Sequence, residues 1–323
     1  MLPIRAPGTI DRCYAFANML SGTAFSGIWP ALLTPLAADL AVDAARFVAH
    51  AQALLAAGCT GVTPFGTTGE GTSFSVAERR DGVDALVDGG VPAERILVSV
   101  SCAALTDALA LTKHALAIGA HGVLMMPPFF HKGVSDRGVI DAYRYVIDRA
   151  ADSRLRLYLY QIPQVSAVGL SHAVIAELVR RYPRTIVGIK DSGCERASSL
   201  ALAAAFMPPL AVYVGNEPDL PELGRRGSAG AVSGLANFMP RVVERLVSQP
   251  DARQTARDLA RVEALLALLG GYSLTPALKG IMASVTGDRA WLAVRPPLVA
   301  LSADESARLE RALRAFGLDP AVD

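Results

Sequence analysis

The sequence predicts an α/β fold, a (β/α)8 barrel with a C-terminal helical appendage. Before about residue 248, short apolar runs alternate with longer amphipathic stretches, the pattern of strands and helices around a parallel sheet. No GxGxxG motif follows the first expected strand, which favours the barrel over a doubly wound open sheet. A unit with two glycines also recurs, in which the first suits a helix end and the second starts a strand: Gly58–Val62, Gly119–Val123 and Gly227–Ala231.

Local signals define the individual elements. Asp43 is expected to cap a helix that runs to about Ala57, and Ser75 to open another helix in a capping box with Glu78. We expect an N-terminal extension over 1–22, the barrel over 23–248 and a helical region over 249–323, packed on the barrel, with helices at 251–269, 275–285 and 303–316. The expected strands are 27–34, 61–65, 96–100, 122–126, 155–160, 185–190, 210–214 and 230–233.

Composition excludes several classes of function. The formal net charge of the 323 residues is +1 with both signs scattered, so no nucleic-acid or membrane partner is expected. No apolar run is long enough to span a membrane, and no signal peptide is recognisable, so we expect a cytoplasmic protein. The four cysteines form no CxxC pair and the five histidines form no metal-binding motif, so neither a disulfide framework nor a metal is expected.

Lysine is rare in this chain. Only four of the 31 basic residues are lysines, and one of them, Lys190, ends the apolar run Ile186–Ile189. A lysine amine can lose its proton and attack a carbonyl, whereas arginine stays protonated. Lys190 is therefore a candidate Schiff-base nucleophile, and its alternative role is to cap a strand and reach into water.

Two further features lie at expected strand ends, where barrel active sites are built. The glycine-rich turn Gly66–Gly71 offers backbone N–H groups and the hydroxyls of Thr67 and Thr68 to a carboxylate; its alternative role is a flexible connection. Tyr160 could transfer protons to a bound intermediate or could be a core residue. Together with Lys190 they predict imine chemistry on a 2-oxo acid, which needs no metal and no organic cofactor.

These residues resemble a known family. Pro64–Glu70, Tyr160–Pro163, Gly188–Asp191, Gly215–Asn237 and Arg295–Leu298 look like the dihydrodipicolinate synthase / N-acetylneuraminate lyase family of pyruvate-dependent class I aldolases, over about residues 27 to 302. The resemblance implies a (β/α)8 barrel that acts on pyruvate or another 2-oxo acid and an aldehyde, usually as a homotetramer.

The resemblance also implies residue roles. Lys190 matches the Schiff-base lysine and Tyr160 the catalytic tyrosine. Thr67 and Thr68, in the turn that Gly66 opens, match the pair that binds the pyruvate carboxylate, with Thr68 also in the proton relay. Val232 matches the position whose backbone carbonyl approaches the bound pyruvate.

The chain departs from dihydrodipicolinate synthases at three positions. Phe130 replaces a tyrosine that completes the relay of a neighbouring subunit, and Val165 replaces an arginine that holds the carboxylate of the aldehyde substrate. Gln161 stands where an asparagine is usual. Losing the arginine removes a charge-assisted contact of roughly 1.5–3 kcal/mol. Phe130 and Val165 are therefore expected on the acceptor side of the substrate site, which becomes less polar.

Three hypotheses follow. The first is an aldolase or lyase acting on a 2-oxo acid such as a 2-keto-3-deoxy sugar acid or a related aldol, for which Asn216 and Glu217 are candidate ligands of sugar hydroxyls. Pro218 stands where sialate lyases have a second acidic residue, and a partly apolar aldehyde also suits the apolar acceptor side. The second is condensation of pyruvate with aspartate semialdehyde. The third is a barrel that binds a 2-oxo acid without turnover.

Overall fold

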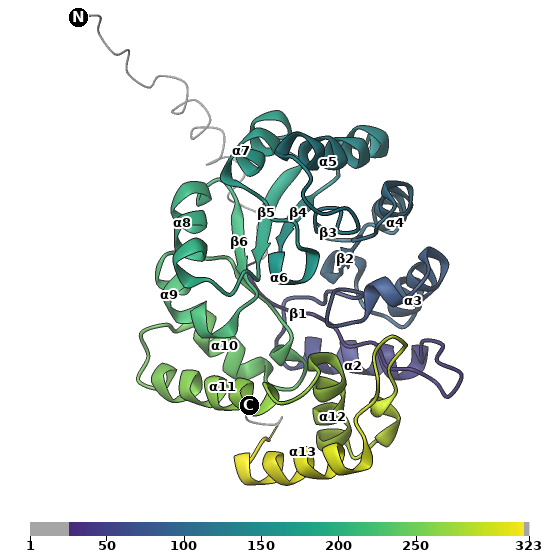
Figure 1. Ribbon diagram of the computed structural model, residues 1–323, viewed down its shortest axis with the longest axis vertical. Helices are drawn as coiled ribbons and strands as arrows, with labels where there is room; N and C mark the ends of the chain where they lie inside the picture. The colour runs from purple at the N-terminus through teal and green to yellow at the C-terminus, as the bar shows by residue number, and fades with distance from the viewer. Residues whose placement is uncertain (1–25, 320–322) are drawn as a thin grey trace, which may run out of the picture.

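The fold is a parallel barrel surrounded by helices (Figure 1). The computed structural model describes residues 26–319 and 323. The expected extension over 1–22 lies outside these residues. Seven parallel strands form one sheet in the order β1-β7-β6-β5-β4-β3-β2. Their bounds are Gly27–Pro30 (β1), Leu97–Ser99 (β2), Gly122–Met125 (β3), Leu157–Gln161 (β4), Ile186–Asp191 (β5), Ala211–Val214 (β6) and Gly230–Ser233 (β7).

The expected strand at 61–65 is shorter than predicted. It forms only two isolated parallel bridges, Ala31↔Thr63 and Val62↔Ile96, which close the barrel between β1 and β2. Pro64 has no N–H to donate to a ladder, and Phe65 has a φ of 55°, outside the strand region. The eighth strand position is therefore present, but the chain leaves it early to enter the turn that follows.

Helices connect the strands and cover the outside of the barrel. They are α2 (Ala44–Ala56), α3 (Val76–Asp88), α4 (Leu105–Ala117), α5 (Asp136–Ala150), α6 (Pro163–Ser166), α7 (His172–Arg181), α8 (Arg196–Phe206), α9 (Leu220–Arg225) and α10 (Pro240–Ser248). Asp43 caps α2 and Ser75 forms the predicted capping box with Glu78 at α3. The three repeated glycines that follow α2, α4 and α9 all have positive φ, as their position after a helix requires: Gly58, Gly119 and Gly227.

Alternation along the strands produces two apolar layers. On β4, Leu157 and Leu159 face the helices, whereas Tyr158 and Tyr160 face the barrel interior. The interior cluster is small and aromatic-rich, with Trp29 and Tyr213 among its members. This cluster fills the interior of the barrel, so a site can form only at the ends of the strands.

The chain ends in the three expected helices, α11 (Thr255–Leu269), α12 (Leu274–Thr286) and α13 (Ala303–Phe316). They lie together beside α10 and α2 on one side of the barrel (Figure 1). Short 3-10 turns occur at Gly71–Ser73 (η1), Glu217–Asp219 (η3) and Arg289–Leu292 (η5), among others. Within residues 26–319 and 323, no single helix is long and apolar enough to cross a membrane.

Candidate active site

Lys190 and Tyr160 meet inside the barrel at the carboxyl ends of β5 and β4. The two residues are direct neighbours in the parallel ladder. The Lys190 Nζ donates a hydrogen bond to the Tyr160 hydroxyl at 3.2 Å and lies 4.3 Å from the centre of its ring. Both side chains are buried. No carboxylate lies within ion-pair distance of Lys190 in the part of the chain that the structure describes.

A threonine extends this pair into a chain of polar atoms. Thr67 Oγ1 lies 3.3 Å from the Tyr160 hydroxyl, which therefore connects Lys190 and Thr67. The resemblance implies a relay role for Thr68, whereas the threonine hydroxyl within hydrogen-bond distance of Tyr160 in this structure is that of Thr67. Thr68 is half-buried and lies against the turn after β7, where a Cβ added to Gly234 would be 3.5 Å from its Oγ1. We call Thr67, Tyr160 and Lys190 the polar chain.

The turn Gly66–Gly71 is held in one conformation by its own backbone. The Gly71 N–H donates to the Gly66 carbonyl at 3.0 Å, and the Glu70 N–H donates to the Thr67 carbonyl at 3.2 Å. A Cβ on Gly71 would lie 1.7 Å from the Phe65 carbonyl oxygen, so only glycine fits there. Among the described residues, no hydrogen bond engages the N–H groups of Thr67 and Thr68. These donors can therefore bind a carboxylate.

Two small features of β5–β7 shape the space around the lysine. Val232 is buried in the interior cluster together with Tyr160. Gly215, which follows β6, makes room for the lysine, because a Cβ there would lie 2.9 Å from Lys190 Cε and 1.9 Å from Ser192 Oγ. The role of Gly215 was not foreseen, since its only signal in the sequence is a glycine after a strand.

The polar residues after β6 are occupied by internal contacts. Glu217 Oε1 accepts hydrogen bonds from Ser233 Oγ at 2.6 Å and from the Leu235 N–H at 3.4 Å. Asn216 Nδ2 donates to Asp219 Oδ2 at 2.7 Å, and Arg196 Nε donates to Asp219 Oδ1 at 2.6 Å. These contacts leave fewer free groups for sugar hydroxyls than the sequence suggested.

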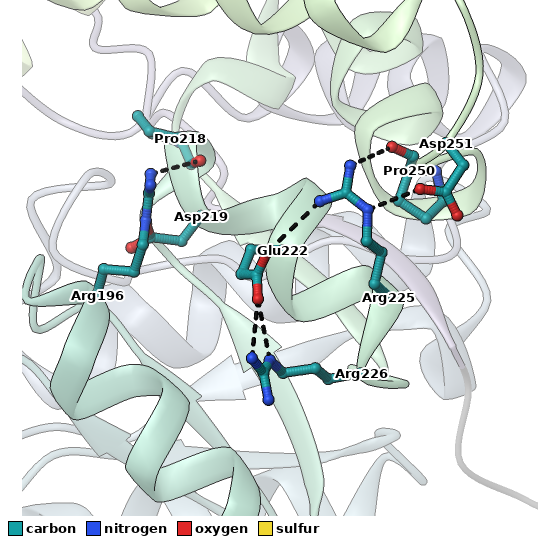
Figure 2. A network of polar contacts seen from close by, with 8 residues as sticks. All are labelled: Arg196, Pro218, Asp219, Glu222, Arg225, Arg226, Pro250 and Asp251. Atoms are coloured by element: carbon teal, nitrogen blue, oxygen red, sulfur yellow. Dashed lines mark hydrogen bonds and ion pairs between the residues drawn. The ribbon is translucent and has the colours of Figure 1, made fainter.

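The contacts of Asp219 belong to a larger polar surface over α8, α9 and the loop between α10 and α11. Figure 2 shows Arg196 reaching the Pro218 carbonyl, while Glu222 receives hydrogen bonds from Arg226 and pairs with Arg225. Arg225 also binds Asp251 at 2.7 Å. Because these charges neutralise one another, this surface supplies no free charge to the site.

A small cavity opens beside Thr67. It has a volume of about 160 Å³, and no charged side chain lines it among the described residues. Val165 and Phe129 form part of its wall, as does Thr67. Phe130, expected on the acceptor side, does not line this cavity in its own chain; its side chain is 72% exposed and stacks edge-on against His131. The remaining lining is Phe65, Gly66, Thr72, Ser99, Ser101, Met126 and Ser166.

Other chemistries find little support near the polar chain. Cys194 follows β5, but burial and the neighbouring carboxylates, led by Glu217, raise the pKa of its thiol, which disfavours a thiolate nucleophile. Within the described residues, no group of three His, Cys, Asp or Glu side chains could hold a metal ion. Gln161 has a structural contact, because its Oε1 accepts the Leu170 N–H at 2.7 Å.

Comparison with known proteins identifies a family. The model of the dihydrodipicolinate synthetase family matches residues 24–316. A DapA-like lyase of Chloroflexus aurantiacus is 32% identical over 295 residues, covering 88% of this chain and 95% of the relative. A 4-hydroxy-tetrahydrodipicolinate synthase of Rhizobium meliloti is 29% identical over 300 residues, covering 91% and 99%.

Solved structures agree as well. The crystal structure of dihydrodipicolinate synthase from Agrobacterium tumefaciens is 33% identical, with a TM-score of 0.84, and covers 90% of this chain and 99% of that one. A 2-keto-3-deoxygluconate aldolase of Sulfolobus solfataricus is 20% identical with a TM-score of 0.80, covers 90% and 96%, and shares the fold.

Proposed function

Because the chain belongs to the dihydrodipicolinate synthetase family, we propose that it is a Schiff-base aldolase or lyase in which Lys190 attacks a 2-oxo acid. Enzymes of this family are lyases that use a catalytic lysine and need no cofactor. The observation that carries the proposal is the hydrogen-bonded sequence that runs from the buried Lys190 and Tyr160 to the exposed Thr67. It supplies a nucleophile and a proton relay next to free backbone donors.

The first half of the reaction forms the imine. The carboxylate of the 2-oxo acid binds the N–H groups of Thr67 and Thr68. The neutral amine of Lys190 attacks C2, and the carbonyl oxygen receives a proton from the Tyr160 hydroxyl. Loss of that oxygen as water leaves a protonated imine. Tyr160 is then a phenolate, and the Thr67 hydroxyl beside it can stabilise that charge by donating a hydrogen bond.

The second half uses the imine as an electron sink. For an aldol substrate, Tyr160 takes the proton of the C4 hydroxyl, the C3–C4 bond breaks, an aldehyde leaves and an enamine remains on Lys190. Tyr160 passes the proton it has taken to C3 of the enamine. Water then hydrolyses the resulting imine to pyruvate and the free amine, and the proton released in this step returns to Tyr160. Run in reverse, the same steps join pyruvate to an aldehyde.

The surroundings of the polar chain favour particular aldehydes. The cavity beside Thr67 is lined by uncharged groups and includes Val165 where a carboxylate-binding arginine would otherwise stand. This supports a 2-keto-3-deoxy acid or related aldol whose aldehyde part carries no charge. Asn216 and Glu217 already hold internal partners, which favours an aldehyde that is also less polar than a sugar.

Condensation of pyruvate with aspartate semialdehyde is a second candidate. It is supported by the 4-hydroxy-tetrahydrodipicolinate synthase of Rhizobium meliloti and by the solved synthase of Agrobacterium tumefaciens. Growth of a strain unable to make diaminopimelate, after expression of this chain, would establish it. If soluble, well-expressed protein gave no growth, this candidate would be rejected.

For the cell we propose a cytoplasmic homotetramer, to be tested by fractionation and light scattering.

Borohydride trapping tests the main proposal. Reduction in the presence of pyruvate should add one pyruvate-derived group to the protein, and peptide mapping should locate it on Lys190. An unmodified Lys190 in folded protein would contradict the proposal. Exchange of the pyruvate methyl protons with deuterium oxide, followed by NMR, reports the enamine; trapping without exchange would indicate a barrel that binds without turnover. A panel of charged and uncharged aldehydes then identifies the acceptor.

A further inference from the structure

A completely buried ion pair lies directly behind the carboxylate-binding turn. Lys279 of α12 pairs with Glu70, and both side chains have an exposed fraction of 0%. Lys279 Nζ also donates to the Ala293 carbonyl at 2.7 Å, and Glu70 Oε2 accepts the Arg295 N–H at 2.8 Å. Glu70 is therefore held both by α12 and by the segment that follows η5.

The same C-terminal segment holds the residues just after the turn. The Arg295 guanidinium donates to the Ser73 carbonyl and to the Leu40 carbonyl, each at 2.9 Å, and pairs with Glu78 at 2.5 Å. It also lies 4.1 Å from the centre of the Phe74 ring. The C-terminal region therefore contacts the end of the turn and η1 through two residues, Lys279 and Arg295.

Stability alone is a weak explanation for the pair. Two buried charges lose their hydration, and well-packed apolar residues of the same volume commonly stabilise a core as well or better. Burial lowers the pKa of Lys279, while Glu70 opposes that shift by favouring the ammonium. An ion pair, unlike a pair of apolar residues, makes a directional contact that can fix one conformation.

Glu70 has a conformation that such a contact would fix. Its φ is 56°, a left-handed value that few non-glycine residues adopt. Its N–H donates to the Thr67 carbonyl, and Thr67 in turn contacts the Tyr160 hydroxyl. A shift of Glu70 would thus move the first member of the polar chain and the free N–H donors beside it.

We propose that Glu70 and Lys279 are positioning residues, whose ion pair holds the turn Gly66–Gly71 in the conformation that binds the carboxylate of the 2-oxo acid. The C-terminal helical region then controls substrate affinity from outside the barrel. The inference rests on the proposed function, because it assumes that this turn binds the substrate.

The test removes both charges together, as Glu70→Leu with Lys279→Met, so that no unpaired charge is buried. Borohydride trapping by intact mass, over a series of pyruvate concentrations, gives a half-saturating concentration and a limiting rate. We expect the half-saturating concentration to rise at least tenfold, with a limiting rate changed less than threefold and a melting temperature near that of the wild type. A folded double variant with wild-type half-saturation would overturn the inference.

A matched control separates positioning from general stability. Arg245 and Asp258 form an ion pair at 2.7 Å between α10 and α11, with the Asp258 side chain 2% exposed, and neither contacts the turn. Arg245→Met with Asp258→Leu should change the melting temperature without changing the half-saturating concentration. An equal rise in this control would also overturn the inference.

Two further arms keep every outcome interpretable. If the double variant does not fold, Glu70→Gln retains an acceptor for the Arg295 N–H and removes the charge; it should raise half-saturation at least threefold, and no rise would reject the inference. If the wild-type protein itself is not trapped by pyruvate, the proposed function fails. If the wild type is trapped and the Glu70 variant that folds has the wild-type half-saturating concentration, only the positioning inference fails.

Discussion

Tyr158 and Tyr160 are two residues apart on β4 and both face the barrel interior, yet their hydroxyls have different partners. Tyr158 lies toward the amino ends of the strands, where its hydroxyl contacts His121 Nε2 at 2.7 Å. Tyr160 lies toward the carboxyl ends, where its hydroxyl contacts Lys190 and Thr67. The same residue type in the same strand thus serves two ends of one barrel.

The partners explain why only one end is suited to chemistry. At the amino end, burial raises the pKa of Tyr158 to about 12 and lowers the pKa of His121 to about 4, so both stay neutral near pH 7. His121 also packs against Trp29, with ring centroids 4.8 Å apart. This end is a neutral aromatic plug. At the carboxyl end, an amine and two hydroxyls meet next to a cavity, the arrangement on which the proposed proton transfer depends.

Removing the nucleophile should have the largest effect. Lys190→Met keeps a side chain of similar length but has no amine, so pyruvate-dependent trapping should vanish and methyl-proton exchange should fall by about four to six orders of magnitude. Lys113→Met, at an exposed lysine on α4, is the control and should leave both signals unchanged. Residual trapping on the Lys190→Met protein would mean that another amine carries the reaction.

The two tyrosines should respond in opposite ways to loss of the hydroxyl. Tyr160→Phe should slow methyl-proton exchange by about 10²–10⁴-fold, the usual contribution of a positioned proton-transfer group, with little change in melting temperature. Tyr158→Phe should leave exchange within threefold and lower the free energy of unfolding by about 1–3 kcal/mol, since His121 loses a buried partner. Equal loss of exchange in both variants would contradict the contrast between the two ends.

Local signals predicted most of the fold, because they act over a few residues. Asp43, Ser75 and Gly58 were assigned from capping rules that depend only on neighbouring backbone groups, and the structure has all three in those roles. The strand at 61–65 was predicted too long, since its apolar run does not reveal the left-handed φ of Phe65. The rule that barrel active sites lie at the carboxyl ends of the strands also predicted that Lys190 and Tyr160 would lie close together.

Contacts between distant segments could not be predicted in the same way. Nothing in the sequence near Glu70 indicates that its partner is Lys279, because the pairing depends on how α12 packs on the barrel. The choice between Thr67 and Thr68 depends on a turn geometry that two adjacent threonines do not specify. Phe130 was expected at the site from its motif, yet in the single chain its neighbour Phe129 lines the cavity.

Acid should weaken the neutral aromatic plug at the amino ends of the strands. The pKa of His121 is 6.5 in the unfolded chain and about 4 in the fold, so the unfolded state takes up a proton first as pH falls. The contribution of His121 to the free energy of unfolding is complete above pH 6.5 and is lost as the pH falls from 6.5 to 4. The loss is at most about 3 kcal/mol. Urea unfolding of wild type and His121→Gln at pH 7 and pH 4.5 measures this.

The free energy of unfolding should depend less on pH in His121→Gln than in the wild type. The difference in slope should correspond to at most one proton taken up on unfolding. His50 is a useful internal comparison, because burial lowers its pKa to about 4 as well and it remains in both proteins. Part of the acid sensitivity should therefore survive in His121→Gln. An identical pH dependence in the two proteins would show that His121 is not held neutral by the plug.

The smallest effect should distinguish the two threonines of the turn. Thr67→Val removes the hydroxyl that contacts Tyr160, so the limiting rate of methyl-proton exchange should fall about tenfold or less, the worth of one hydrogen bond. Thr68→Val removes no contact with Tyr160 and should mainly raise the half-saturating pyruvate concentration. Both parameters come from one NMR titration. The reverse pattern would return the relay role to Thr68 and would mean that the turn rearranges when substrate binds, so that Tyr160 exchanges one threonine partner for the other.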